Sequence, residues 1–287
     1  MVPARRLGLK TPAAGAPRLG ETWPRPSRRI QSVAMLDLEA YLARIGLRGR
    51  PGLAELHRAH VTSIPFENLD PRRGIPVSLA AEDLERKLVH DRRGGYCFEQ
   101  NLLLKAALEA LGVRVEPLLA RVRVGASPGN PRPRSHLVLR VRAEGRDWHA
   151  DVGFGHGTLL EPIPFGPDAP QEQSGWRFRV VEDGPELVLQ TAQDGDWLDL
   201  YGFVPEPVPF IDIETSNWFT CTHPRSPFVT GLIVSAQRPD GARVSLSDWR
   251  GLSLSEETPA GGSTRPVDPG EVRELIASRF GLQGFDG

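Results

Sequence analysis

Cysteine is scarce in this sequence. Only Cys97 and Cys221 occur among 287 residues, which is too few for a disulfide framework in a chain of this length. That usage suits a reducing compartment, and the sequence therefore predicts a cytoplasmic protein. A lone cysteine is most often a buried structural side chain, so each of the two has to be judged by its surroundings.

Long apolar runs and an excess of one charge are also missing. No apolar stretch approaches the ~20 residues that span a bilayer. Lysine is confined to Lys10, Lys87 and Lys105, but arginine brings the basic residues to 35 against 36 acidic ones, for a net charge of −1. This balance gives no electrostatic basis for binding nucleic acid or a membrane surface, so neither partner is predicted.

Acidic residues are nearly absent from residues 1–34, where Glu21 stands alone among Arg, Pro, Ala and Gly. No continuous apolar segment is present, so a secretory signal is not predicted. Met35 begins an amphipathic pattern that resembles a natural protein start. We therefore expect residues 1–34 to be a disordered tail or an extension from a wrongly assigned start.

Helical patterns follow this segment. Helices are predicted over 37–46, from 51 onward and over 78–89. Asp37 is placed to cap the first of them. His57 and His60 share one face of the second, at a spacing that metal ligands use, but no third ligand lies nearby and no metal site is predicted.

From residue 113 the helical period gives way to short runs rich in Val, Leu and Trp between turn signals. The predicted strands are 113–124, 136–141, 148–152, 176–181, 187–191 and 197–201. This pattern is typical of a barrel or closed sheet. Further strands are predicted over 228–236, 242–246 and 249–254, and a helix begins at Asp268 with capping-box spacing to Glu271.

The most informative stretch is RGGYCFEQN at residues 93–101. An apolar stripe predicts a helix that begins at Cys97 and stops at Gly112. Gly94 and Gly95 allow a close backbone approach just before the helix. A thiol at a helix start lies near unpaired N–H groups and the positive end of the dipole, which favour thiolate. Position alone leaves Cys97 as either a nucleophile or a structural cysteine.

A nucleophilic cysteine needs a base, and the base needs a group that orients it. Residues 135–141 predict a strand that carries His136, and residues 147–152 predict a second strand that carries Asp151. A short loop between them predicts an antiparallel hairpin, in which His136 and Asp151 can meet. His149 is a rival base, because it shares a strand face with Asp151.

Taken together, these motifs resemble those of the arylamine N-acetyltransferase family. Similar segments occur in the same order from about Met35 to the C-terminus. They are IPFENL (64–69), RGGYCFEQN (93–101), SHL (135–137), WHADVGFG (148–155), NWFT (217–220) and SPF (226–228). The resemblance implies an α+β fold around a cysteine-protease-like Cys-His-Asp core. We expect an N-terminal helical bundle over 35–119, a central β-barrel over 120–216 and a C-terminal α/β lid over 217–287.

For the site, the resemblance implies Cys97, His136 and Asp151 as the catalytic residues and selects His136 over His149. Phe66 is expected to line the acceptor pocket, with Phe154 and Phe219 as further substrate-binding residues. Coenzyme contacts are expected from Gly153, Gly155 and Thr230, in a Gly-rich turn whose N–H groups suit a pyrophosphate and at a hydroxyl further on. Thr230 is equally well explained as an exposed strand residue.

Several side chains are predicted to support this site or to lie outside it. Arg93 and Glu67 are expected to form an ion pair that holds the Cys97 loop. The loop at 125–134 is a candidate lid, and its arginines at 132 and 134 either contact coenzyme phosphates or are solvated. Cys221 has no helix start and no evident base, so it is interpreted as structural.

The resemblance implies an enzyme that transfers acetyl from acetyl-CoA to an arylamine or arylhydrazine, with the oxygen of an N-hydroxyarylamine as a further acceptor. Transfer would pass through an acetyl-cysteine, with ping-pong kinetics and no metal. A Cys-His-Asp hydrolase or a transglutaminase-like acyltransferase uses the same three groups and stays open as the alternative. A binding protein that kept the fold is disfavoured by the intact set. We expect a monomer or weak homodimer.

Overall fold

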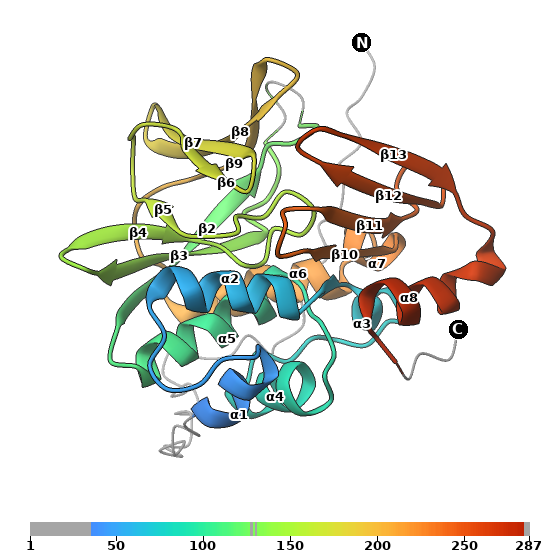
Figure 1. Ribbon diagram of the computed structural model, residues 1–287, viewed down its shortest axis with the longest axis horizontal. Coiled ribbons are helices and arrows are strands. Elements are labelled where there is room, and N and C mark those ends of the chain that lie inside the picture. The colour runs from blue at the N-terminus through green and yellow to red at the C-terminus, as the bar shows by residue number, and fades with distance from the viewer. Residues whose placement is uncertain (1–35, 127–128, 130, 284–287) are drawn as a thin grey trace, which may run out of the picture. The chain divides into compact units, whose positions relative to one another are not determined.

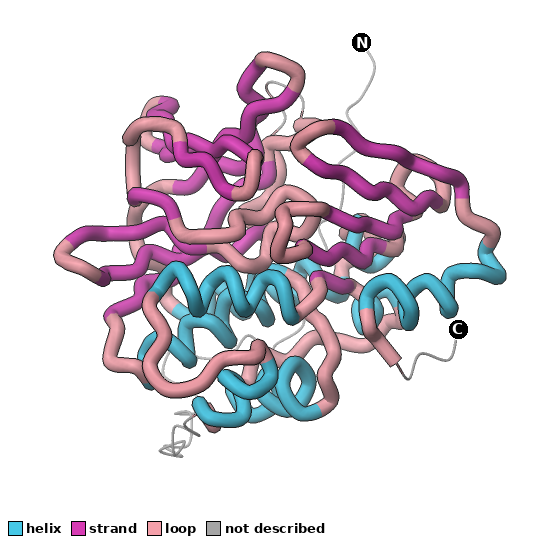
Figure 2. Tube along the Cα trace, viewed as in Figure 1, coloured by secondary structure: helices cyan, strands magenta, loops and turns pink. Residues whose placement is uncertain are grey.

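Most helices precede the strands along the chain, and the strands form two antiparallel sheets (Figure 1, Figure 2). The computed structural model describes residues 36–126, 129 and 131–283. The expectation for residues 1–34 therefore lies outside the described residues. Within them the chain is an α+β protein, as the sequence predicts, and they belong to one compact unit.

The first helices follow the predicted periodicity, with the short α3 in addition. They are α1 (Leu38–Arg44), α2 (Leu53–Ser63), α3 (Leu69–Arg72), α4 (Ala81–Glu85), its π-helical continuation η1 (Arg86–His90) and α5 (Cys97–Ala110). Asp37 caps α1, because its Oδ1 accepts the Ala40 N–H at 3.0 Å. The third predicted helix begins later than Ser78, whose hydroxyl instead donates to Asp83 Oδ2 at 2.7 Å. In the described part of the chain, no helix has both the length and the apolar character needed to cross a membrane.

The larger sheet has eight antiparallel strands in the order β5-β4-β3-β2-β9-β8-β7-β6. Their bounds are β2 (Arg114–Val122), β3 (His136–Ala143), β4 (Arg146–Ala150), β5 (Ile163–Pro164), β6 (Gln171–Gln173), β7 (Trp176–Asp183), β8 (Glu186–Gln193) and β9 (Asp196–Phe203). The predicted β3–β4 hairpin is confirmed, with Ala143 opposite Arg146. Its turn residues Glu144 and Gly145 both have positive φ, as a two-residue type I′ turn requires. β5 and β6 are too short to leave an alternating pattern, and the sequence did not predict them.

This sheet curls into a nearly closed barrel. One buried cluster combines Leu118 of β2, Val138 of β3, Ile163 of β5, Phe178 of β7 and Leu189 of β8. Strands from opposite ends of the sheet order thus contribute to the same core, which a flat sheet cannot do. The predicted barrel is confirmed in this form.

A second core joins the helices to the outer face of the barrel. Leu56 of α2, Leu88 of η1 and Leu104 of α5 pack in one cluster with Leu139 and Val141 of β3. In Figure 1 α2 and α5 run along β3 and β4. Because side chains alternate along a strand, β3 gives Leu139 and Val141 to the helices, while Val138 points into the barrel interior.

The smaller sheet has the order β1-β10-β11-β12-β13. Its strands are β1 (Phe66–Glu67), β10 (Ile233–Gln237), β11 (Arg243–Ser247), β12 (Ser253–Thr258) and β13 (Gly261–Pro266). β1 comes from the helical part of the chain and pairs with β10, placing Phe66 opposite Ser235. The predicted final helix is confirmed: the 3₁₀ turn η2 (Pro269–Glu271), with Asp268 and Glu271 forming the capping box, leads into α8 (Val272–Phe280).

The segment of chain between β9 and β10 differs most from the prediction. Helices α6 (Phe210–Thr222) and α7 (Pro227–Thr230) occupy a part for which no helix was predicted. The strand predicted from residue 228 is wrong in its first residues, because Ser226 caps α7 by accepting the Phe228 N–H and Pro227 occupies its first turn. α6 also runs through the boundary expected at 216/217, and β2 runs through the one at 119/120, so the three-part division stays a prediction.

Candidate active site

Cys97 is the first residue of α5 and is buried, with 3% of its surface exposed. Its Sγ lies 3.6 Å from the Ser135 carbonyl oxygen. The backbone before it approaches its neighbours closely, as predicted. A Cβ on Gly94 would lie 2.2 Å from the Pro65 carbonyl oxygen, and one on Gly95 would lie 2.7 Å from Glu99 Oε2. A larger residue at Gly94 would therefore clash with the backbone just before β1, and one at Gly95 would clash with the Glu99 side chain of α5.

His136 and Asp151 meet at one end of the barrel. His136 begins β3, and Asp151 directly follows β4. The His136 Nε2 lies 2.8 Å from Asp151 Oδ2, and both side chains are buried. They are not a cross-strand pair, because β3–β4 pairing ends at Leu139 and Ala150. Asp151 reaches His136 from the turn after the strand.

Asp151 accepts hydrogen bonds at both carboxylate oxygens. Besides His136 at Oδ2, its Oδ1 accepts from Asn101 Nδ2 at 2.9 Å and from the Gly153 N–H at 2.8 Å. Asn101 also accepts the Val152 N–H at 3.1 Å. Asn101 lies within the motif at 93–101, but no role was predicted for it. Its spacing of four from Cys97, on the same face of α5, was the signal that could have found it.

Electrostatics favour a charged His136–Asp151 pair. Burial by itself lowers the pKa of His136, but the Asp151 carboxylate, together with hydrogen bonds to Asp151 and Cys97, raises this pKa above its usual range. Burial by itself raises the pKa of Asp151, but His136 and the hydrogen bonds from Asn101 and Gly153 hold it well below its usual range. The site can therefore hold a proton on the imidazole beside Cys97.

His149 points to a different partner. Its Nε2 lies 2.8 Å from the Tyr201 hydroxyl, and its ring stacks on Phe203 with centroids 4.9 Å apart. Burial lowers the pKa of His149 to about 4, so this imidazole is neutral. Burial and the nearby Asp151 carboxylate raise the pKa of Tyr201 well above its usual range. The structure thus brings His136, not His149, into direct contact with Asp151.

The two histidines of α2 hydrogen-bond to residues that adjoin the site. His57 Nε2 accepts the Asp151 N–H at 3.2 Å, and its Nδ1 lies 3.1 Å from the Leu160 carbonyl oxygen. His60 lies between the Tyr41 hydroxyl and Gln100 Oε1, at 2.8 and 2.7 Å. Burial lowers their pKa values to about 4 and about 3. No group of three His, Cys, Asp or Glu residues in the described ranges is placed to hold a metal ion.

The Gly-rich turn has a steric reason for its first glycine. A Cβ on Gly153 would lie 2.7 Å from Cys97 Cα and 2.9 Å from Asn101 Nδ2. Its N–H, expected to serve a pyrophosphate, donates to Asp151 instead. The Gly155 carbonyl accepts from Gln237 Nε2 at 3.0 Å. The turn is therefore packed against both the nucleophile helix and the smaller sheet.

The other predicted contacts are spread over three places. Phe154 lies beside His136, with ring centroids 5.1 Å apart. Phe66 belongs to the same buried cluster as Cys97. Phe219 of α6 stacks on His223, the residue after that helix, with ring centroids 4.4 Å apart, and it belongs neither to the Cys97 cluster nor to the rings beside His136. Thr230 ends α7, not a strand as the alternative supposed, and its hydroxyl donates to the Ser226 carbonyl at 3.1 Å.

The predicted ion pair at the nucleophile loop is present. Arg93 Nη2 lies 2.7 Å from Glu67 Oε1, and Nη1 lies 2.8 Å from Asp70 Oδ1. The loop expected to act as a lid includes residues 127, 128 and 130, which lie outside the described residues. Arg132 in that loop donates to the Gly125 carbonyl at 2.7 Å.

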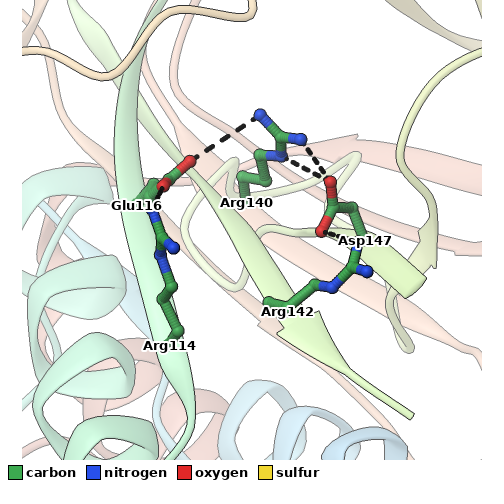
Figure 3. Close-up of a pocket in the computed structure, with 5 residues that line it drawn as sticks. All are labelled: Arg114, Glu116, Arg140, Arg142 and Asp147. Atoms are coloured by element: carbon green, nitrogen blue, oxygen red, sulfur yellow. Dashed lines mark hydrogen bonds and ion pairs between the residues drawn. The ribbon is translucent and has the colours of Figure 1, made fainter. Parts of the chain in front are cut away.

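A pocket of about 400 Å³ lies elsewhere, on strands β2, β3 and β4 (Figure 3). Its lining side chains are Arg114, Glu116, Arg140, Arg142 and Asp147. They already pair with one another: Arg114 with Glu116 at 2.7 Å, Arg142 with Asp147 at 2.9 Å, and Arg140 with both carboxylates. The even-numbered β3 residues share a face with His136, but Val138 of the barrel core lies between them. We assign this self-paired pocket no ligand.

Known proteins share this fold and sequence. A family model described as N-acetyltransferase matches residues 51–284. The chain is 43% identical to an arylamine N-acetyltransferase of Mycolicibacterium smegmatis, over 86% of this chain and 92% of that one. It is 32% identical to the arylamine N-acetyltransferase / N-hydroxyarylamine O-acetyltransferase of Salmonella typhimurium, over 85% and 88%. The Mycobacterium marinum arylamine N-acetyltransferase in complex with CoA superposes with a TM-score of 0.81 at 37% identity, covering 86% and 93%.

The family model thus identifies an N-acetyltransferase. With relatives this similar over nearly their whole length, the chain belongs to the arylamine N-acetyltransferase family, and the resemblance found in its motifs is confirmed.

Proposed function

We propose that this protein transfers the acetyl group of acetyl-CoA to a small aromatic amine or hydrazine, and to the oxygen of N-hydroxyarylamines. The observation that carries the proposal is the buried Cys97–His136–Asp151 set in a chain whose relatives are arylamine N-acetyltransferases. The donor is supported by the relative in complex with CoA, and the oxygen acceptor by the Salmonella relative. No metal takes part.

In the first half-reaction Cys97 gives its proton to His136, and Asp151 stabilises the imidazolium. The thiolate attacks the thioester carbonyl, and backbone N–H groups at the start of α5, that of Cys97 included, hold the oxyanion. The bond to the CoA sulfur breaks, and that sulfur takes the proton from His136. One thioester replaces another, so this step is readily reversible.

In the second half-reaction the neutral amine attacks acetyl-Cys97. His136 takes the proton that the amine nitrogen loses, the bond to Cys97 sulfur breaks, and the proton returns to the thiolate. Arylamines are weakly basic and stay unprotonated at pH 7, which suits them to this step. The covalent intermediate predicts ping-pong kinetics.

Around these three residues we propose a cysteine-protease-like core with an aromatic acceptor pocket. Phe154 beside His136 and Phe66 in the Cys97 cluster support that pocket, and Phe219 would extend it from α6. We assign coenzyme contacts to the turn at 153–155 and to Thr230, whose oxygen still has acceptor capacity.

We further propose a cytoplasmic location and a monomer or weak homodimer. Two unpaired, buried cysteines support the location, because an oxidising compartment favours disulfides. The support role of the Arg93–Glu67 pair and the division at 119/120 and 216/217 belong to the same proposal.

The test is the mass of the Cys97 peptide after brief exposure to acetyl-CoA without an amine. We expect one acetyl group on that peptide and an equal amount of released CoA, with the group discharged by added arylamine. A Cys97→Ser variant serves as control. No acetyl-enzyme and no CoA release, even with amine present, would reject the proposal. Discharge that is equally fast without amine would favour the hydrolase alternative.

A further inference from the structure

Lys87 is a buried lysine beneath the active-site loop. It lies in η1, and its side chain is 11% exposed. Its Nζ lies 2.7 Å from both Glu99 Oε1 and Asp70 Oδ2, and 3.8 Å from Glu67 Oε1. The three carboxylates come from α5, α3 and β1. A cation at this point therefore connects three separate elements.

Charges in this cluster do not cancel. Arg93 pairs with Glu67 and Asp70, so two cations face three carboxylates. Lys87 Nζ pairs with both Asp70 and Glu99 at 2.7 Å, and Asp70 also pairs with Arg93. Loss of Lys87 would leave three carboxylates facing Arg93, and Glu99 would lose the cation that its Oε1 contacts.

Glu99 connects Lys87 to the nucleophile. Its second oxygen, Oε2, accepts the Tyr96 N–H at 3.0 Å, and Tyr96 directly precedes Cys97. The same carboxylate packs so closely against Gly95 that a Cβ there would lie 2.7 Å away. The position of the Glu99 carboxylate thus sets the backbone that leads into Cys97.

The main chain of Lys87 contacts Arg93, at the start of the loop that leads to Cys97. Its carbonyl accepts the Arg93 N–H at 3.0 Å. The π-helical turn, a feature often found at functional sites, places both this carbonyl and the side chain toward residues 93–99.

We propose that Lys87 is a positioning residue for the Cys97 nucleophile, acting through Glu99. It holds the Glu99 carboxylate against the loop at 95–97, and its charge offsets that carboxylate so that a thiolate can form in the same helical turn. The inference rests on the proposed function for the role of Cys97. It adds a residue outside the Cys-His-Asp set and outside the Arg93–Glu67 pair.

The protonation states agree with this role. Burial by itself lowers the pKa of Lys87, but Glu99, Glu67 and Asp70 raise this pKa above its usual range. Burial raises the pKa of Glu99, which Lys87 opposes. Lys87 therefore stays charged, and it is the cation that offsets the Glu99 carboxylate.

Three charged groups lie near Cys97 in the structure or along the chain. His136 begins β3 and pairs with Asp151 after β4, while Glu99 lies two residues further along α5 and accepts the N–H of Tyr96, the residue before Cys97. Of these, only Glu99 contacts Lys87 in the described structure. A change at Lys87 should therefore reach the thiolate through Glu99.

The test is the pH dependence of Cys97 alkylation by iodoacetamide, followed by peptide mass. For Lys87→Met we expect the midpoint to rise by about one pH unit, which is about a 10-fold loss of thiolate near neutral pH. The double variant Lys87→Met/Glu99→Gln removes both charges and keeps an acceptor for the Tyr96 N–H, so its midpoint should return close to that of the wild type. The single variant Glu99→Gln should shift the midpoint downward.

Two controls separate positioning from general damage. Lys105→Met makes the same substitution at an α5 lysine that pairs with Glu109, and it should leave the midpoint unchanged. Cys221 serves as the unfolding control, because its buried thiol has no base beside it as Cys97 has in His136, so its alkylation should rise only when the core opens. If Lys87→Met does not fold, the opposite shift expected for Glu99→Gln still tests the proposal.

An unchanged midpoint in folded Lys87→Met, with only the melting temperature lowered, would overturn the inference. So would a double variant whose midpoint does not recover. Alkylation needs no acetyl-CoA, so it is independent of the proposed reaction. The expected shifts in a protein that transfers no acetyl would support Lys87 and reject the proposed function.

Discussion

Strand β3 carries ion pairs of opposite character at its two ends. At its start the His136–Asp151 pair is buried, and both Asp151 oxygens are hydrogen-bonded. Further along the same face, Arg140 and Arg142 hold Asp147 where solvent reaches, and the Arg142 side chain is 57% exposed (Figure 3). In both pairs a cation attracts a carboxylate, but the buried pair lies in a medium of much lower dielectric constant than the exposed pair.

That difference decides what each pair can do. In the buried pair the carboxylate raises the pKa of His136, so a proton can be stored beside Cys97. At the exposed end water and salt screen the charges, and such pairs contribute little to stability. We therefore expect variants at the two ends of one strand to have very different effects.

The sharpest comparison is Asp151→Asn against Asp147→Asn. Asp151→Asn should lower kcat/KM for acetyl transfer by about 10³- to 10⁴-fold, because an amide cannot stabilise the imidazolium. Asp147→Asn should stay within about 2-fold of the wild type. Steady-state kinetics with an arylamine measures both, and circular dichroism checks the fold. If Asp151→Asn kept more than a tenth of wild-type activity, the buried pair would not matter more for catalysis than the exposed pair in the way argued above.

Two glycines extend the comparison, Gly153 beside the buried pair and Gly145 in the turn near the exposed pair. Gly153→Ala inserts a Cβ 2.7 Å from Cys97 Cα, and we expect a loss of about 2–3 kcal/mol in unfolding free energy together with most of the activity. Gly145→Ala, in the β3–β4 turn, meets open space but needs positive φ, so about 1 kcal/mol should be lost and activity kept. Urea unfolding and transfer assays check both. Equal effects on activity would contradict the packing argument.

The buried pair should also be visible in the pH dependence of stability. The raised pKa of His136 means that its contribution is fully present below the unfolded value of about 6.5 and is lost as pH rises through the folded value. The lowered pKa of Asp151 means that its contribution is present above about pH 4 and is lost as pH falls through the folded value. The pair therefore stabilises most near pH 5–6.5.

We accordingly expect the stability difference between wild type and His136→Gln to be largest near pH 6. It should shrink between pH 7 and 10, by at most about 1.4 kcal/mol per pH unit. Urea unfolding at several pH values measures it. The stability difference between wild type and Arg142→Ala serves as the comparison for an exposed pair, and it should not change with pH over this range. A His136 difference that grows toward pH 9 would mean that the imidazole is neutral in the folded protein.

Much of this site was readable from the sequence because the signals were local. The start of α5 at Cys97, the β3–β4 hairpin and the Asp268 cap depend on residues within one turn or one strand. The meeting of His136 and Asp151 was correctly predicted, although the contact runs through the turn after β4 rather than across the hairpin.

What the sequence missed depends on long-range contacts. Lys87 meets Glu99 across 12 positions, and His57 meets the Asp151 backbone across 94. No periodicity encodes such distances. β1 is only two residues long and exists because it pairs with β10. Two residues show no alternating pattern, so β1 could not be predicted without knowing its partner strand. Helix α6 was hidden because its apolar residues do not form one stripe: Phe210, Ile211 and Trp218 stay exposed.

The smallest effect is expected at the exposed end of β3. Arg142→Ala removes one partner of Asp147, which keeps Arg140, so the loss in unfolding free energy should be about 0.5 kcal/mol or less. Because solvent ions screen this pair, the difference from wild type should disappear in 1 M NaCl, where the Debye length is about 3 Å. Paired urea unfolding at low and high salt measures it, with Arg146→Ala at the start of β4 as control. A loss above 2 kcal/mol that persists at high salt would mean that the two ends of the strand do not differ in the way their burial implies.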